Sequence, residues 1–296
     1  MTRPADDEET AMPRPPRTPP PGSVRPLDGL LPVTGASWQP VCRELRSTGA
    51  SVVYGSVADW LPADLGDRRL AAALGQDHAR LRHLTRPQVR RRFVASRLLL
   101  KTAAGAVLGA APEELELAYK PGGRPYLRGI DQLDVSLSHT GELLVVGLTR
   151  HSRIGVDVER ADRRMLGLGT ERQVCTPYEL EALRRVAEDR RNGELVRLWT
   201  LKEAYSKAIG QGLRFRFTEF GFGARDGRIR LLRPDGSPGV GGEWHFGSWR
   251  VSGRFTVSAA VHDPGFGDRP GPGGRSPFDA ASTGPLPLPD RGSTTC

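Results

Sequence analysis

The stretch from Trp199 to Lys207 combines an aromatic ring, a carboxylate and an ammonium group at helical spacing. Residues three, four and seven apart lie on one face of a helix, so Trp199, Glu203 and Lys207 face the same way. We expect Asn192 to cap the start of this helix and Gly210 to end it. Taken alone, Glu203 and Lys207 are most simply an exposed ion pair that adds about 0.3 kcal/mol to the stability of the helix.

A second acidic element lies upstream, in the stretch from Ile154 to Glu159. Apolar and polar residues alternate there, which indicates a half-buried strand whose Asp157 and Glu159 side chains lie side by side. Two carboxylates this close repel each other, which raises the pKa of one of them unless a cation lies between them. Oxygen ligands of this kind suit Mg²⁺, which needs few protein carboxylates when phosphate and water complete its octahedron. For this pair alone, a solvated strand face is the simpler interpretation.

Together, the two stretches resemble the phosphopantetheinyl transferases of the larger, Sfp-like type. That family is marked by Gly-[Ile/Val]-Asp-x-Glu and, roughly forty residues later, by Trp-x-x-Lys-Glu-Ala-x-x-Lys. The chain has Gly155-Val156-Asp157-Val158-Glu159 and then Trp199-x-x-Lys202-Glu203-Ala204-x-x-Lys207. Either motif alone is weak, but both in this order and at this spacing are strong, and the resemblance covers about residues 50 to 262.

The resemblance implies transfer of the 4′-phosphopantetheine arm of coenzyme A to a serine of an acyl or peptidyl carrier protein, with release of 3′,5′-ADP. It implies that Asp157, Glu159 and Glu203 hold Mg²⁺, or Mn²⁺ in its place, and that Lys207 contacts phosphate. Glu203 is also a candidate for the base that accepts the serine proton, directly or through water. Lys202 lies beside this group, and both phosphate contact and support of the helix remain open for it.

The family binds coenzyme A with groups that lie earlier in the chain. Arg80 and Arg92 match, through a loose alignment, the cations that hold the adenosine end of coenzyme A and its 3′-phosphate. Arg124 and Pro125 occupy a Gly/Pro turn where the family has Lys-Pro. The planar guanidinium of Arg124 replaces the compact ammonium of the family's lysine, so the geometry of a phosphate contact would change. An ordinary turn with an exposed arginine is the alternative.

The segment from Asp134 to Thr140 reads as a strand, because apolar residues alternate with polar ones. Its end resembles the family's Leu-Ser-His-Ser/Thr motif, whose histidine hydrogen-bonds a phosphate of coenzyme A. The resemblance therefore assigns Ser138 and His139 to cofactor binding. Without it, a lone histidine would more often be structural.

The resemblance implies an α+β fold in which two similar halves form a pseudo-dimer, with the active site in the cleft between them. We divide the chain into a disordered tail at 1–37, an N-terminal half at 38–150, a C-terminal half at 151–262 and a disordered tail at 263–296. The first half would bind coenzyme A and the second would carry the metal and catalytic motifs. Both tails are rich in Pro and polar residues and cannot bury a core.

Periodicity and turn residues predict the elements that carry these motifs. We expect a strand and turn at 50–61, broken helices at 62–84, a helix at 88–104, a return strand at 143–149, a capping box at 176–179 that opens a helix, and strands within 214–233 and 243–262. The phenylalanines and tryptophans of the last two stretches are interpreted as core packing.

The net charge of +9 is concentrated in the middle of the chain, because each tail carries −1 and residues 38–262 carry +11. A basic body implies an acidic partner such as nucleic acid, a polyphosphate ligand or an acidic protein. No apolar run approaches the roughly twenty residues that span a bilayer, and the N-terminus lacks the apolar core of a signal peptide. Three widely spaced cysteines fit a reducing compartment. We therefore expect a cytoplasmic protein without a membrane partner.

Two other classes of function compete with the transferase. A nucleic-acid-binding module would bind DNA in a salt-sensitive way, but the basic residues lack interleaved aromatics in a known motif. A non-catalytic subunit that binds carrier proteins would not need intact Asp157, Glu159, Glu203 and Lys207. The short trimeric carrier-protein synthases perform the same chemistry, but this chain is about twice as long. We therefore expect a self-contained monomer without a nucleic-acid partner; the carrier protein and its pathway, whether fatty acid, polyketide or nonribosomal peptide, remain open.

Overall fold

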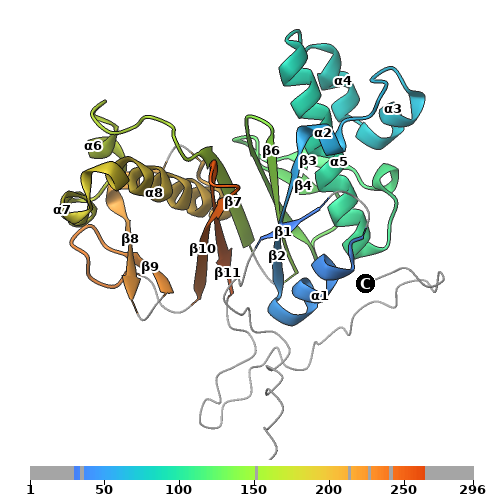
Figure 1. Cartoon of the computed structure of the whole chain (residues 1–296). Coiled ribbons are helices and arrows are strands. Elements are labelled where there is room, and N and C mark those ends of the chain that lie inside the picture. The colour runs from blue at the N-terminus through green and yellow to red at the C-terminus, as the bar shows by residue number, and fades with distance from the viewer. Residues whose placement is uncertain are drawn as a thin grey trace, which may run out of the picture.

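The computed structural model describes residues 30–33, 37–150, 153–212, 215–225, 228–239 and 243–263. These residues form two α+β halves that meet along their sheets (Figure 1), and the expected α+β class is confirmed. The expected tails lie mostly outside the described residues, but Leu31–Pro32 forms a short strand inside the N-terminal one. The expected boundary near residue 150 stays a prediction.

The N-terminal half consists of a four-stranded sheet covered by one long helix. The sheet order is β1 (Leu31–Pro32), β2 (Ala50–Ser56), β6 (Leu143–Thr149) and β5 (Asp134–Thr140). β1 runs parallel to β2, and the other neighbours are antiparallel. The covering helix, α5 (Pro87–Leu108), has a proline in its first turn and ends at Gly109, whose φ of 70° suits a residue without a side chain.

The remaining elements of this half surround α5. They are α1 (Gln39–Thr48), α2 (Val57–Trp60), α3 (Arg68–Leu74), α4 (Asp77–Arg82), η1 (Pro112–Glu114), β3 (Leu117–Tyr119) and β4 (Pro125–Leu127). The strand expected at the start of 50–61 is confirmed as β2, a short helix, α2, stands where the turn was expected, and the broken helices at 62–84 are confirmed as α3 and α4. Lys101 of α5 is fully buried, and its ammonium donates to the carbonyl of Ala73.

The C-terminal half repeats this plan with a three-stranded antiparallel sheet and one long helix. The sheet order is β10 (Trp244–Val251), β11 (Phe255–His262) and β7 (Arg153–Arg160), and the helix is α8 (Glu188–Ala208). The smaller elements are α6 (Thr170–Val174), α7 (Pro177–Arg185), η3 (Phe217–Glu219), β8 (Gly221–Arg225) and β9 (Arg228–Leu232).

The two sheets share an apolar core, and α5 and α8 cover their outer faces (Figure 1). In β6, Val145 joins this central core, whereas its neighbour Val146 packs in the core beneath α5. In β11, Val257 likewise points to the central core and Ala260 points toward α8. The strand alternation therefore sends successive side chains into different cores.

The helix boundaries in the second half follow their caps. Thr176 and Glu179 form the expected capping box of α7. α8 begins at Glu188, so the expected start at Asn192 is wrong by one turn. The Asn192 side chain instead accepts from the N–H groups of Met165 and Leu166 and anchors that loop to the helix. None of the helices in the described ranges is both long and apolar enough to cross a bilayer.

Candidate active site

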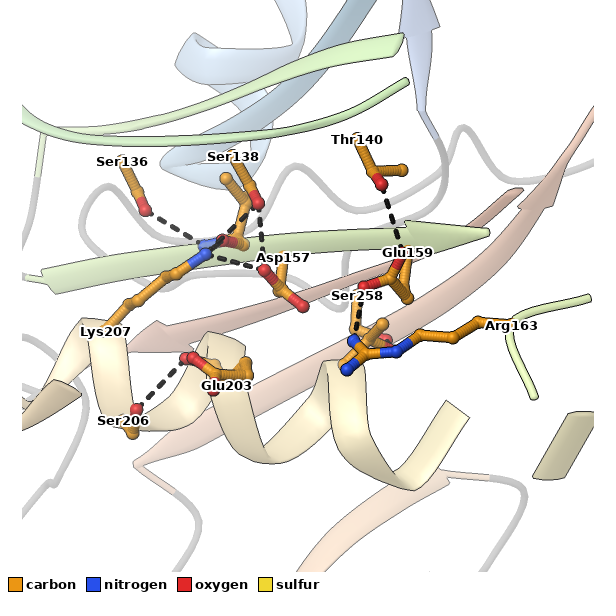
Figure 2. A network of polar contacts seen from close by, with 12 residues as sticks. Ser136, Ser138, Thr140, Asp157, Glu159, Arg163, Glu203, Ser206, Lys207 and Ser258 are labelled. Carbon is orange, nitrogen blue, oxygen red and sulfur yellow. Dashed lines mark hydrogen bonds and ion pairs between the residues drawn. The ribbon is translucent and has the colours of Figure 1, made fainter. Parts of the chain in front are cut away.

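The two motifs meet where β7 packs against α8 (Figure 2). Gly155 permits this approach, because a Cβ atom at that position would overlap the backbone of Ala204 in the helix. Asp157 then faces the helix turn that carries Glu203. Both carboxylates are buried, with 7% and 8% of their surface exposed. The motif glycine thus explains how acids from two separate elements come close together.

Lys207 connects the two halves of the protein through the carboxylate of Asp157. Its Nζ lies 2.6 Å from Oδ1 of Asp157 and also donates to Oγ of Ser138 and the carbonyl of Val156, both at 3.1 Å. Ser138, on β5 of the N-terminal half, donates to the same Oδ1 at 2.8 Å. These contacts, drawn in Figure 2, place an ammonium, a hydroxyl and a carboxylate in one network.

Glu203 has a strongly perturbed acidity. Its pKa is raised to about 7, mainly by burial and also by the negative charge of Asp157, against the lowering effect of the charges of Lys207 and Arg163. The carboxyl group is therefore about half protonated near neutral pH. A carboxylate with this pKa can accept or release a proton under physiological conditions.

Glu159 is held by groups on both sides of β7. Arg163 forms an ion pair with its Oε2 at 2.5 Å, and Thr140 of β5 donates to its Oε1 at 3.1 Å (Figure 2). The Arg163 guanidinium also lies over the ring of Trp199, 5.1 Å from the centroid. Glu159 is thus close to Asp157 in sequence, but its charge is already neutralised by Arg163.

Polar side chains along the whole of β5 contact β7, where the two halves meet. Asp134 accepts from the N–H of Ile154 at 2.9 Å, and Ser136 accepts from the N–H of Val156 at 3.0 Å. With Ser138 and Thr140, they form a row that pairs with β7 through side chains rather than through backbone hydrogen bonds. Asp134, Ser136 and Arg163 were not predicted as site residues from the sequence. The alternation of polar residues in β5 was visible, but nothing indicated what that face would contact.

A cleft of ≈430 Å³ opens beside this network, between the halves. Its wall includes Glu203 and Lys207 of α8, Ser136 of β5, and the turn around Arg124. A cleft of this size can hold a small-molecule ligand. It combines apolar surface with an ammonium and a carboxyl group, as a binding site for a phosphorylated organic molecule requires.

His139 lies on the N-terminal side of the site among positive charges. Its pKa is lowered to about 4 by desolvation and by the charges of Arg92, Arg97 and Lys207. The imidazole is therefore neutral at pH 7, and the surrounding cations favour an anion at this position. The charge of Arg92 therefore acts on His139, and the phosphate contacts expected of these two residues stay predictions.

Arg80 is placed differently from Arg92. It bonds to the buried carboxylate of Asp77 at 3.3 Å and stacks on the ring of Tyr119 at 4.3 Å, with 54% of its side chain exposed. Asp77 also binds Arg97 and the hydroxyl of Tyr119. Arg80 does not line the cleft, so a contact between Arg80 and the cofactor would lie outside the cleft.

Arg124 lines the cleft with Pro125, but its guanidinium is already engaged. It donates to the carbonyl of Lys207, to Asp134 at 2.5 Å and to the carbonyl of Ile154 at 2.9 Å. Only 12% of its side chain is exposed. The alternative of an ordinary turn with an exposed arginine is wrong, because this guanidinium connects β5, β7 and α8.

Lys202 points away from the site into the core of the C-terminal half. Its Nζ lies 2.7 Å from Oε2 of Glu179 and donates to the carbonyls of Phe217 and Phe220, both at 2.6 Å. The residue is fully buried, so all three ammonium protons have partners within the protein. Of its two possible roles, phosphate contact is excluded by this geometry and support of the helix is favoured.

The acidic residues fit a divalent cation by their chemistry. Within the described ranges, no three His, Cys, Asp or Glu side chains are already arranged around a metal position. Glu203 nevertheless has a carboxylate destabilised by burial and by Asp157, and a cation between the two would remove that repulsion. Glu159 could join them only if Arg163 released it.

Comparison with known proteins identifies the family. The family model of the 4′-phosphopantetheinyl transferase superfamily matches residues 153–260. The L-aminoadipate-semialdehyde dehydrogenase-phosphopantetheinyl transferase of Eremothecium gossypii is 30% identical over 205 residues, which cover 65% of this chain and 73% of that protein. The 4′-phosphopantetheinyl transferase of Bacillus subtilis is 25% identical over 186 residues, 62% of this chain and 82% of its own. The chain therefore belongs to the 4′-phosphopantetheinyl transferase superfamily.

Some relatives are matched over a smaller share of their length. The 4′-phosphopantetheinyl transferase HetI of Nostoc sp. is 32% identical over 148 residues, which are 49% of this chain and 62% of HetI. A Synechocystis relative is matched over 57% of its length. The chain spans less than two thirds of these cyanobacterial proteins, so its activity, substrates and partners remain proposals.

Solved structures give a partial match. A holo-(acyl-carrier-protein) synthase from Bacillus anthracis, in complex with CoA (3′,5′-ADP), matches 38% of this chain and 95% of its own, with a TM-score of 0.32 and 23% identity. Holo-[acyl-carrier-protein] synthase from Thermotoga maritima matches 38% and 62%, with a TM-score of 0.31. Family membership rests on the sequence relatives.

Proposed function

We propose that the protein transfers the 4′-phosphopantetheine arm of coenzyme A to a serine hydroxyl of an acyl or peptidyl carrier protein. The observation that carries this proposal is the buried acidic pair of Asp157 and Glu203, which meets Lys207 at the edge of a cleft between the halves. Such a site combines a cation for phosphate with a carboxyl group that titrates near pH 7.

In the proposed reaction, the serine Oγ attacks the β-phosphorus of the coenzyme A pyrophosphate. A new phosphorus–oxygen bond forms, the bond to the bridging oxygen breaks, and 3′,5′-ADP leaves. The serine proton passes to the Glu203 carboxylate, directly or through a water molecule. Negative charge develops on the phosphate oxygens, and Lys207 stabilises it from a fixed position. Catalysis on this account is mostly positioning and electrostatics.

Asp157, Glu159 and Glu203 would hold Mg²⁺, or Mn²⁺ in its place. When bound, the ion neutralises charge on the pyrophosphate and so favours departure of 3′,5′-ADP. Recruitment of Glu159 requires Arg163 to give up its ion pair. Arg163 is half exposed, so it can turn toward solvent at small cost, because exposed ion pairs contribute at most about 1 kcal/mol.

The remaining contacts to coenzyme A are assigned to the N-terminal side of the cleft. Arg92, Ser138 and His139 are proposed to hold phosphate groups, supported by the positive field around His139. Pro125 would pack against the cofactor at the cleft wall, and Arg80 would contact its adenosine end. Neutral His139 can donate a hydrogen bond to phosphate without any change in protonation.

We further propose a cytoplasmic monomer that binds neither nucleic acid nor membrane. The carrier protein would come from a pathway that uses tethered intermediates, such as polyketide or nonribosomal peptide synthesis. Both halves contribute to the cleft, so one chain supplies a complete site. Size-exclusion chromatography with light scattering tests the oligomeric state, and a dimer would overturn that part of the proposal.

The activity is tested by mass spectrometry of an apo carrier protein incubated with the enzyme, Mg²⁺ and coenzyme A. We expect the carrier to gain the mass of one phosphopantetheine arm, and a Ser→Ala carrier to gain none. A panel of apo carriers from different pathways would identify the partner. If no carrier in a broad panel is modified while coenzyme A binds, the transferase proposal is wrong.

A further inference from the structure

Arg124 makes more contacts across the junction than any phosphate role would need. Its guanidinium reaches three elements at once: Asp134 on β5, Ile154 on β7 and Lys207 in the last turn of α8. Arginine has five N–H donors in a planar fork, and these contacts use three of them. Its positive charge is also paired with the Asp134 carboxylate, which reduces its attraction for a second anion.

The contact with α8 is made at the carbonyl of Lys207, not at its side chain. Carbonyl groups in the last turn of a helix lack partners within the helix and carry the negative end of its dipole. The same carbonyl accepts the N–H of Gly210 at 3.1 Å, in the turn that ends the helix. A guanidinium at this position therefore fixes the end of α8 to the N-terminal half.

That helix end determines where the Lys207 ammonium lies. Lys207 must span from α8 to Asp157 and Ser138, and Glu203 lies one turn earlier on the same helix. A small shift of the helix end would move both groups relative to the β5 and β7 side of the cleft. Misplacement of catalytic groups by about 1 Å can cost roughly 100-fold in rate.

We infer that Arg124 is a positioning residue, which locks the C-terminal turn of α8 to β5 and β7 and so places Lys207 and Glu203 in the cleft. This inference rests on the proposed function for its kinetic consequence, but not for its structural one. Lysine cannot replace Arg124 in this role, because one ammonium cannot reproduce a planar fork aimed at three elements. The arginine in the Gly/Pro turn thus differs in role from the lysine of the resembling motif.

The test compares Arg124→Lys with Asp134→Asn, because the two possible roles predict opposite results. If Arg124 positions the helix, both variants lower kcat by about 10- to 100-fold while the Kd for coenzyme A, measured by calorimetry, changes by less than about twofold. The double variant is then no worse than the poorer single variant, since both remove one network. Arg184→Lys, an exposed arginine on α7, serves as the matched control and should behave as the parent.

If Arg124 is instead a phosphate ligand, Arg124→Lys retains its rate and Asp134→Asn binds coenzyme A at least as well as the parent, which would overturn the inference. Hydrogen exchange supplies a readout that does not depend on the activity. We expect faster exchange in residues 204–212 of Arg124→Lys than in the Arg184→Lys control, and unchanged exchange there would also overturn the inference. A parent enzyme that modifies no carrier would refute the proposed function and leave the exchange result to decide on the helix anchor.

Discussion

Lys202 and Lys207 belong to one helical motif and lie five residues apart, but they meet opposite environments. Lys202 is fully buried beneath the aromatic core and pairs with Glu179. Lys207 keeps 27% of its side chain exposed and pairs with Asp157 at the wall of the cleft. Residue type and motif are therefore a poor guide to role, and the position of each side chain around the helix decides it.

The difference divides α8 into a supporting face and a reacting face. On the supporting face, Glu179 also accepts from the N–H groups of Thr176 and Phe222, so the ion pair ties α7, α8 and β8 together. On the reacting face, Glu203 and Lys207 of α8 meet Asp157 of β7 beside the cleft. Substitutions on the first face should affect stability, and substitutions on the second should affect binding and rate.

The largest effect is expected from Asp157→Asn on β7, opposite the reacting face of α8. The change removes a metal ligand and the partner of Lys207, so transfer should fall by about 10³-fold or more. The melting temperature should stay within a few degrees of the parent, about 3 °C. A mass-spectrometric rate within about tenfold of the parent would contradict the assignment.

On the supporting face, Lys202→Met should lower the free energy of unfolding by about 3–5 kcal/mol, because Glu179 is left charged without its buried partner. Urea unfolding measures this loss. The kcat of the folded fraction at low temperature should match that of the parent. Selective loss of coenzyme A affinity in folded Lys202→Met would show that the two faces are not separate in function.

Glu203→Gln should change how stability depends on pH. The folded pKa of Glu203 is raised from 4.5 to about 7, so the folded state binds more protons between these values and stability falls as pH rises through them. Glutamine does not ionise, so the variant should avoid a loss of roughly 3 kcal/mol in metal-free protein. We therefore expect the variant to be more stable than the parent at pH 8, by a margin that shrinks toward pH 5. Thermal unfolding in chelator tests this, and a pH-independent difference would contradict the assigned pKa.

The smallest effect on binding and stability is expected from Lys207→Gln, whose transfer rate should also fall because the ammonium that stabilises the developing charge is lost. Removal of one phosphate contact should weaken coenzyme A binding by about tenfold, as for a hydrogen bond to a charged group. The affinity should also depend less steeply on salt, because one fewer cation neutralises the phosphates. Calorimetry at several salt concentrations measures both, and an unchanged dissociation constant would remove Lys207 from the cofactor site.

The sequence was sufficient to predict the parts that depend on local pattern. The β7 alternation, the Thr176–Glu179 capping box and the strands of the last hundred residues all follow from spacing and turn residues. The convergence of Asp157 and Glu203 was expected only through the family resemblance. Gly155 provides its physical basis, because a side chain there would keep the helix away from the strand.

The sequence was insufficient where a role depends on what lies across a tertiary contact. Lys202, for which the sequence left phosphate contact and helix support open, and Lys101 are both buried with partners from distant segments. Arg124 reads as an exposed turn residue until β5, β7 and α8 are placed around it. Asn192 resembles a cap because its real partners, in the loop before α6, are not predictable from spacing.

The most direct test of the convergence of these acids is a titration of the protein with Mn²⁺ in the presence of coenzyme A, followed by electron paramagnetic resonance. The parent and Lys202→Met should bind one ion with equal affinity, whereas Asp157→Asn and Glu203→Gln should lose that site. Equal Mn²⁺ binding by Asp157→Asn and the parent would show that the acids from β7 and α8 do not share a cation.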